Sequence, residues 1–260
     1  AEKFMPGPIT VIMPKKDIIP KEVTGGLDTV AVRCPKDIVA HTLIKLSGVP
    51  IAAPSANISG RPSPTEADTV IREMTGRIDM IIDGGNCDIG LESTIVKADG
   101  DGVKLLRPGG VTVEMLHNIC GRVTIDKAVT EKLNDGERPE APGMKYRHYA
   151  PQASMHLICG DGDDFYMRAA EFIKAKLREN ADAGVLCPDE IADVLSGKYI
   201  VRLGKISDTE EHARRLFSAL RKFDDMGVQT IYAVSDGEKG IGLALYNRML
   251  KASGYSVINI

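Results

Sequence analysis

The chain of 260 residues contains no tryptophan, and aromatic residues make up only 5% of it. Stacking platforms for single-stranded nucleic acid are built from aromatic side chains, so this scarcity argues against such a platform. No apolar run approaches the roughly 18 residues that a membrane helix needs, and no secretory signal is visible. The absences predict a cytoplasmic protein that makes no membrane contact.

Paired cysteines and an excess of positive charge are lacking as well. The five cysteines are an odd number, are widely spaced and form no Cys-x-x-Cys pair, which argues against a zinc site or a disulfide framework. We expect reduced thiols and no structural metal. The formal net charge of −3 argues against broad electrostatic attachment to nucleic acid. An RNA contact would need a local basic patch.

Short apolar segments that predict strands alternate with patterns that predict helices. They fall into two parts of the chain, one before and one after residues 135–143. The first part predicts helices at 37–46 and 65–74, and strands at 9–13, 29–33, 50–53, 80–83, 93–96 and 103–107. The last part predicts helices at 165–179, 209–223 and 241–252, and strands at 155–159, 184–187, 199–202, 230–234 and 256–260. The alternation of strands with helices in this last part is typical of a parallel α/β sheet. A breaker-rich stretch at 135–143 predicts a linker.

The run Pro54–Thr65 crowds hydroxyls, an amide, a glycine and an arginine into a turn between an apolar segment and a helix. Hydroxyl donors, close backbone approach at glycine and the arginine fork suit a phosphate or carboxylate ligand. An ordinary turn, in which Ser63 or Thr65 caps the following helix, explains the same residues. The loop alone does not decide between the two.

Similar polar groups stand at or near other predicted strand ends. They are Thr29, Arg33, the Glu92-Ser93-Thr94 run and Arg107. If these ends and the Pro54–Thr65 loop faced one cleft, arginines and hydroxyls together would form a site for an anionic ligand.

Several segments, in this order, resemble the motifs of the YrdC/Sua5 family. They are Phe4–Thr10, Val30–Pro35, Ala53–Gly60, Gly90–Ile95 and Leu106–Gly109, while Ala141–Pro151 resembles the linker of the longer Sua5 type. The resemblance covers essentially the whole chain. It implies a twisted mixed-sheet YrdC-like domain at 1–128, a linker at 129–152 and a smaller Rossmann-like parallel α/β domain at 153–260.

The resemblance also implies the activity of a threonylcarbamoyl-AMP synthase, a nucleotidyltransferase. Such an enzyme converts L-threonine, bicarbonate or CO2, and ATP into threonylcarbamoyl-AMP and pyrophosphate. A partner machinery then transfers the threonylcarbamoyl group to adenosine 37 of tRNAs. Magnesium would arrive with ATP, and a contact with double-stranded RNA or tRNA is possible within this family.

The family's binding roles carry over onto matching positions of this chain. L-threonine would be held by Arg33, Ala53 and Ser93. ATP would be contacted by Thr29, Ser55, Ser63, Arg107 and Tyr149, with Asn57 orienting the loop or a ligand group. No covalent nucleophile and no general acid or base is assigned.

The chain also departs from the family pattern. In the family a Pro-Thr-Glu-Thr-Val-Tyr-Gly-Leu-like run and a basic Lys-x-Arg pair normally precede the Pro-Gly-Pro motif, and neither precedes that motif in this sequence. We therefore expect the N-terminal part of the YrdC domain to be absent from these 260 residues, and the chain alone to be inactive or much weakened.

Two other functions fit parts of the pattern. A double-stranded RNA or tRNA-binding module without catalysis would need segregated basic side chains, because residues 1–128 hold 15 Lys and Arg against 16 Asp and Glu. The carbamoyl-adenylate module of hydrogenase maturation proteins is the other alternative. Those proteins carry zinc-binding cysteine motifs and an acylphosphatase-like flank, neither of which is found in this sequence.

Overall fold

The computed structural model describes residues 2–134, 149–235, 237 and 239–260, so residues 135–148 of the expected linker lie outside the described part. Two compact units are present, and they do not follow the order of the chain. Unit 1 contains the described residues of Ala1–Ser55, Ile82–Gly84 and Glu92–Lys145. Unit 2 contains those of Ala56–Ile81, Gly85–Leu91 and Tyr146–Ile260. Part of the predicted loop thus belongs to unit 2.

Unit 1 is built on a mixed five-stranded sheet in the order β2-β1-β3-β4-β5. β1 pairs antiparallel with β2 and parallel with β3, and β4 pairs antiparallel with β3 and parallel with β5. The buried core includes Ile12, Ile95, Leu106 and Ala128. The strands are β1 (Ile9–Pro14), β2 (Thr29–Val32), β3 (Thr94–Asp99), β4 (Gly102–Arg107) and β5 (Val123–Ile125), accompanied by α1 (Lys21–Thr24), α2 (Ile38–Ser47), α4 (Val113–Cys120) and η1 (Lys127–Val129).

Unit 2 contains a second five-stranded sheet, in which every pair of neighbouring strands is parallel. Its strand order is β10-β6-β9-β7-β8. The elements are β6 (Ser154–Cys159), α5 (Phe165–Glu179), β7 (Gly184–Cys187), α6 (Asp189–Ala192), β8 (Tyr199–Arg202), α7 (Thr209–Met226), β9 (Thr230–Val234), α8 (Gly242–Ala252) and β10 (Val257–Asn259). The predicted parallel α/β sheet is confirmed.

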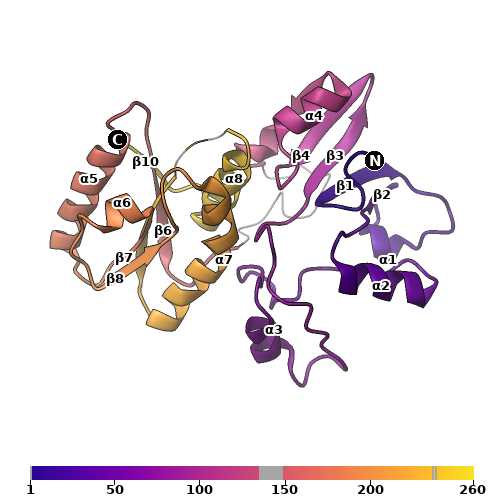
Figure 1. Cartoon of the computed structure of the whole chain (residues 1–260), viewed down its shortest axis with the longest axis horizontal. Coiled ribbons are helices and arrows are strands. Elements are labelled where there is room, and N and C mark those ends of the chain that lie inside the picture. Colours follow the sequence, from indigo (N-terminus) through magenta and orange to yellow (C-terminus); the bar gives the residue numbers. More distant parts are fainter. Residues whose placement is uncertain (1, 135–148, 236, 238) are drawn as a thin grey trace. The chain divides into compact units, whose positions relative to one another are not determined.

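Helices cover both faces of the second sheet (Figure 1). Successive strand residues point to opposite faces, and β7 shows this directly. Val185 and Cys187 pack with α5 and α6 in one buried cluster, whereas Leu186 packs with α7 and α8 in the other. The three-layer arrangement explains why these strands are apolar throughout. α3 (Ala67–Met74) also belongs to unit 2.

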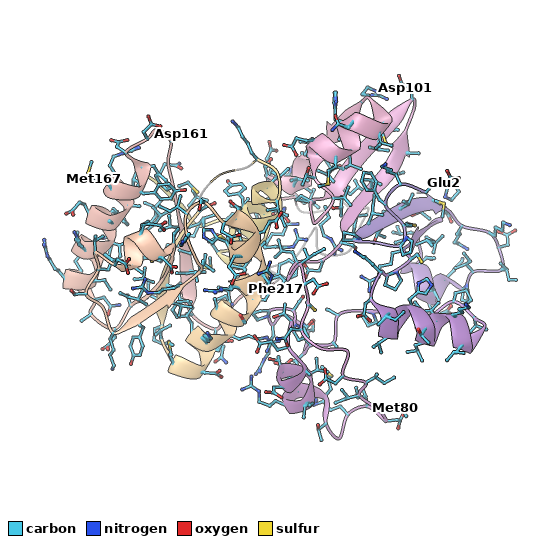
Figure 2. The ribbon with its side chains drawn as sticks, viewed as in Figure 1. Glu2, Met80, Asp101, Asp161, Met167 and Phe217 are labelled. Carbon is cyan, nitrogen blue, oxygen red and sulfur yellow. The ribbon has the colours of Figure 1, made fainter. Side chains whose placement is uncertain are left out.

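Two predicted strands are wrong. Segments 50–53 and 80–83 are not strands, and neither pairs with any other strand in the described part of the chain. Ile51 is 44% exposed and Met80 is 74% exposed, and Met80 lies on the loop after α3 (Figure 2). An apolar run forms a strand only where a neighbour accepts its backbone hydrogen bonds.

The alternative explanation of the loop as an ordinary helix cap does not hold, because α3 begins after Glu66 and neither Ser63 nor Thr65 caps it. Several short elements were not predicted. These are α1, α4, β5, α6 and η1. Among the helices of the described residues, none has both the length and the apolar character that crossing a membrane requires.

Phe223 tests the packing of the second sheet. Its ring is fully buried in the cluster under α7, and a Cβ added at Gly184 would lie 2.7 Å from that ring. Phe223→Ala should lower the free energy of unfolding by about 3–5 kcal/mol, because it leaves a cavity in a close-packed interior. Urea unfolding followed by circular dichroism measures the change. Met167→Ala, at a position 66% exposed, is the control. Equal stability losses in the two variants would contradict this packing.

Candidate functional site

A hydroxyl and guanidinium cluster lies at one edge of the sheet in unit 1. We call it the sheet-edge cluster, and it consists of Thr10, Ser93 and Arg107. Ile9 of β1 pairs in parallel with Thr94 of β3, so Thr10 and Ser93 reach the same edge. Their hydroxyl oxygens are 2.7 Å apart. Arg107, the last residue of β4, donates from Nε to the Ser93 carbonyl at 3.1 Å and from Nη2 to the Ser93 hydroxyl at 3.2 Å.

The turn that carries Ser93 is held by close backbone contacts. The Thr94 hydroxyl donates to the Val111 carbonyl at 2.7 Å and accepts from the Val111 amide at 2.9 Å. Gly109 packs so tightly on the turn that an added Cβ would lie 2.5 Å from both the Glu92 oxygen and the Thr94 nitrogen. Ser93 is only 6% exposed. The sheet-edge cluster is therefore a preorganised group of donors.

The register of β2 separates two of the predicted site residues. Val32 pairs with Val11, so Arg33 follows at the edge where Thr10 lies. Thr29 pairs with Pro14 and lies at the opposite end of the strand. The structure thus brings Arg33 to the same edge as Ser93 and Arg107, but not Thr29. Ala53 and Ser55 lie on the exposed segment after α2.

Unit 2 contains a second charged group, which links the loop after Asn57 to two helices. We call it the ion-pair cluster, and it consists of Arg61, Glu73 of α3 and Arg221 of α7. Arg221 Nη1 and Arg61 Nη1 lie 2.6 Å and 3.2 Å from Glu73 Oε1. Arg221 also donates from Nη2 to the Pro62 carbonyl. The side chains of Glu73 and Arg221 are only 7% and 12% exposed.

Glu73 is held in its charged form. Burial by itself would raise the pKa of this carboxyl, but hydrogen bonds from Arg221 and from the Ile58 amide, at 3.1 Å, outweigh burial and lower the pKa below its usual value of 4.5. The nearby charge of Arg221 and a hydrogen bond from Arg61 act in the same direction. The charged Glu73 carboxylate therefore accepts hydrogen bonds from Ile58 and Arg61 on the loop and from Arg221 on α7.

Asn57 braces the same loop from within. Its Nδ2 donates to the carbonyl of Ile58 at 2.9 Å and to that of Arg61 at 3.2 Å. Asn57 thus bonds to the loop that follows it. Ser63, half-buried, directly follows Pro62, the residue held by Arg221.

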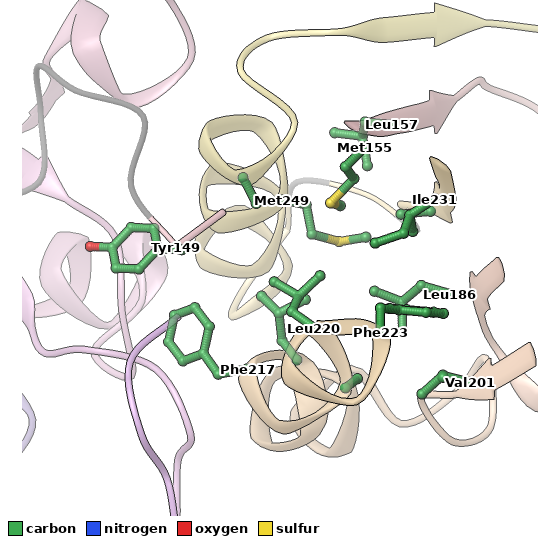
Figure 3. Packing of buried hydrophobic residues seen from close by; sticks show 14 of the residues in the cluster. Tyr149, Met155, Leu157, Leu186, Val201, Phe217, Leu220, Phe223, Ile231 and Met249 are labelled. Atoms are coloured by element: carbon green, nitrogen blue, oxygen red, sulfur yellow. The ribbon is translucent and has the colours of Figure 1, made fainter. Parts of the chain in front are cut away.

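Tyr149 is buried against α7. Its ring stacks on Phe217 with centroids 5.2 Å apart and an interplanar angle of 29° (Figure 3). The guanidinium of Arg248, a fully buried side chain of α8, lies 5.6 Å from the centre of the same ring. The tyrosine backbone has a φ of 65°, which a side-chain-bearing residue adopts only where its surroundings hold it.

Sequence reasoning missed three residues of these clusters. Thr10 stands inside the first family motif, and its alternation with Ile9 on β1 is the only signal that could have found it. Glu73 and Arg221 lie 148 residues apart in the chain. A single sequence contains no signal that would pair them. No group of three or more His, Cys, Asp or Glu residues that could hold a metal ion occurs within the described ranges.

The pKa of Glu73 predicts a pH dependence of stability. Because the folded pKa is lowered, the stabilising contribution is complete above about pH 4.5 and is lost as the pH falls through the folded pKa. Glu73→Gln should cost about 2 kcal/mol near neutral pH. The difference from the unmodified protein should shrink towards acid. Urea unfolding between neutral pH and acid measures it.

The control for this prediction is Glu210→Gln, at an exposed carboxylate in the first turn of α7. It should reproduce the stability profile of the unmodified protein. A constant difference between Glu73→Gln and the unmodified protein across the pH range would contradict the assigned role of Glu73.

Two family models match the chain, and together they cover nearly all of it. The Sua5/YciO/YrdC model, described as "Telomere recombination", matches residues 1–109. A second model, described as "Threonylcarbamoyl-AMP synthase, C-terminal domain", matches residues 111–254.

Relatives and solved structures agree with these models. The chain is 45% identical to a threonylcarbamoyl-AMP synthase of Pyrococcus abyssi, over 100% of the chain and 74% of the relative. It is 42% identical to one of Bacillus subtilis, over 99% of the chain and 72% of the relative. The crystal structure of P. abyssi Sua5 complexed with L-threonine matches with a TM-score of 0.90 at 45% identity, over 100% of this chain and 74% of that chain. The chain therefore belongs to the YrdC/Sua5 family, among the threonylcarbamoyl-AMP synthases with a Sua5 C-terminal domain.

Proposed function

We propose that the protein makes threonylcarbamoyl-AMP and pyrophosphate from L-threonine, bicarbonate or CO2, and ATP. The observation that carries the proposal is the 45% identity, over the whole chain, to a threonylcarbamoyl-AMP synthase. The match to a relative crystallised with L-threonine supports the amino acid substrate. The product would pass to a machinery that modifies adenosine 37 of tRNAs in the cytoplasm.

The chemistry needs two anions to be brought together. The threonine amine first forms a bond to the carbon of CO2 and loses a proton, which gives a carbamate. A carbamate oxygen then attacks the α-phosphorus of ATP, the bond to the β-phosphate oxygen breaks, and pyrophosphate leaves. The nucleophile is weak and negatively charged, so positioning and cationic donors supply the catalysis. ATP is taken as its magnesium complex, and Mg²⁺ therefore belongs to the substrate.

The sheet-edge cluster suits the amino acid side of this reaction. We assign the threonine carboxylate to Arg33, whose planar fork can bind it in a bidentate manner, with the Ala53 backbone and Ser93 completing the site. Arg107 holds the Ser93 hydroxyl and carbonyl at 3.2 and 3.1 Å, and its charge favours an anion at this edge.

The remaining predicted residues are assigned to the nucleotide. We assign ATP contacts to Ser55, Ser63, Arg107 and Tyr149, with Asn57 bracing the loop through Ile58 and Arg61. Thr29 completes the predicted set. Its position opposite Pro14, at the far end of β2, gives this last assignment no support from the sheet.

The direct test is an assay of the full-length protein in which one substrate at a time is omitted. Pyrophosphate release should require L-threonine, bicarbonate and ATP together, and mass spectrometry should detect threonylcarbamoyl-AMP. Release without threonine, or release that uses carbamoyl phosphate in its place, would contradict the proposal and favour a carbamoyl-adenylate module. Salt-sensitive binding of double-stranded RNA without any adenylate formation would favour the RNA-binding alternative.

Arg33 tests the substrate assignment. Arg33→Met removes the proposed partner of the threonine carboxylate, so the KM for threonine should rise about 100-fold while the KM for ATP stays unchanged. Lys36→Met, which removes a nearby exposed cation, is the matched control and should leave both constants unchanged. A larger effect on the KM for ATP than on that for threonine would reassign Arg33 to the nucleotide.

A further inference from the structure

Helix α7 has two neighbouring stripes of side chains, and Phe217 of the second stripe is buried in the same core cluster as the first. Ala213, Leu216, Leu220 and Phe223 form the core stripe, with the three- and four-residue spacing of one helix face. The adjacent stripe, offset by one residue, consists of Arg214, Phe217, Arg221 and Asp224. We call it the contact stripe.

The contact stripe touches three segments that are far apart in the chain but lie in the same unit. Arg214 donates from Nε to the Asp88 carbonyl at 3.0 Å, and a Cβ added at Gly90 would lie 2.4 Å from the Arg214 Cα. Phe217 stacks on Tyr149. Asp224 Oδ1 accepts from the Gln152 amide at 2.7 Å.

Arg221 contacts the third segment, which is the loop after Asn57. One guanidinium reaches both the Glu73 carboxylate, 2.6 Å away, and the Pro62 carbonyl. Glu73 in turn accepts from the Ile58 amide. The 58–62 loop is thus held at both of its ends by one buried pair. Removing Glu73 leaves the buried Arg221 charge without its counterpart, and removing Arg221 leaves Glu73 with only the more exposed Arg61, which makes the pair sensitive to substitution.

Two of these three segments are ones to which the proposed function assigns the nucleotide. Asn57 and Ser63 flank the loop that Arg221 and Glu73 hold, and Tyr149 lies on Phe217 of the same helix. Two of the four contacts go to backbone carbonyls and one to a backbone amide, so they fix the course of the chain whichever side chains the segments carry. Through these contacts helix α7 supports the proposed nucleotide site.

We propose that Arg221 is a positioning residue for ATP, acting from the C-terminal domain through Glu73 and the Pro62 carbonyl to hold the Asn57–Ser63 loop. The inference rests on the proposed function, because the loop is a nucleotide loop only if that function holds. It gives the C-terminal domain a role in forming the ATP site itself.

The test compares two arginines of the same helix in the complete translated product. Arg221→Met removes the contacts to Glu73 and Pro62. Arg215→Met is the matched control, because Arg215 is exposed and its side chain forms a surface ion pair with Glu211 at 2.5 Å. Arg221→Met should raise the Kd for ATP about 10- to 100-fold and leave the Kd for L-threonine unchanged. Arg221→Lys should recover part of the loss, since a lysine can pair with Glu73 but lacks the second arm of the fork.

A second measurement does not depend on ATP. Hydrogen exchange of the 56–65 peptide in the ligand-free protein should be faster in Arg221→Met than in the unmodified protein and unchanged in Arg215→Met. Exchange elsewhere in unit 2 should stay the same, which separates loss of the loop contact from general unfolding. The double variant Glu73→Gln/Arg221→Met should lose no more ATP affinity than the worse single variant, because the two side chains act as one unit.

The outcomes separate the two claims. Faster exchange at 56–65 together with weaker ATP binding supports the proposal. If exchange at 56–65 in Arg221→Met matches that of the unmodified protein, Arg221 does not hold the loop. If exchange is faster but the Kd for ATP is unchanged, Arg221 holds the loop but does not position ATP. If the unmodified protein bound no ATP, the proposed function would fail and the link to ATP with it, while the exchange result would still decide whether Arg221 holds the loop.

Discussion

A carboxylate held between two guanidiniums is the interaction that ties the loop after Asn57 to the helices of unit 2. Glu73, only 7% exposed, accepts from Arg61, Arg221 and the Ile58 amide at once. Two charged donors and one backbone donor offset the cost of taking the carboxylate out of water. Because they outweigh that cost, the pKa of Glu73 lies below its usual value. Because the donors come from the loop and from α7, one side chain ties the two together.

The same interaction explains why the compact units do not follow the motif order. Residues 56–81 belong by sequence to the region matched by the first family model, yet they fold in the unit of the parallel sheet. Helix α7 explains this placement, because its contact stripe contacts the 58–62 loop, the 88–90 segment and Tyr149. The sheet-edge cluster of unit 1, by contrast, is fixed by strand register and by the tight packing of Gly109.

Sequence patterns were sufficient where a residue's neighbours are set by periodicity. The alternation of strands with helices after residue 153 predicted a parallel sheet, and the structure confirms it. Periodicity failed at 50–53 and 80–83, because an apolar run does not reveal whether a partner strand lies beside it. The family motifs led to Ser93 and Arg107, which the structure joins. They could not reveal Arg221, whose partner lies 148 residues away.

Helix α7 holds the 56–65 and 149–152 segments, and we assign ATP to both of them. Hydrogen exchange during an ATP titration of the full-length protein measures whether the two segments respond together. Peptides covering 56–65 and 149–152 should gain protection at a shared ATP midpoint. Protection confined to 56–65, or midpoints that differ between the two peptides, would show that α7 does not couple them.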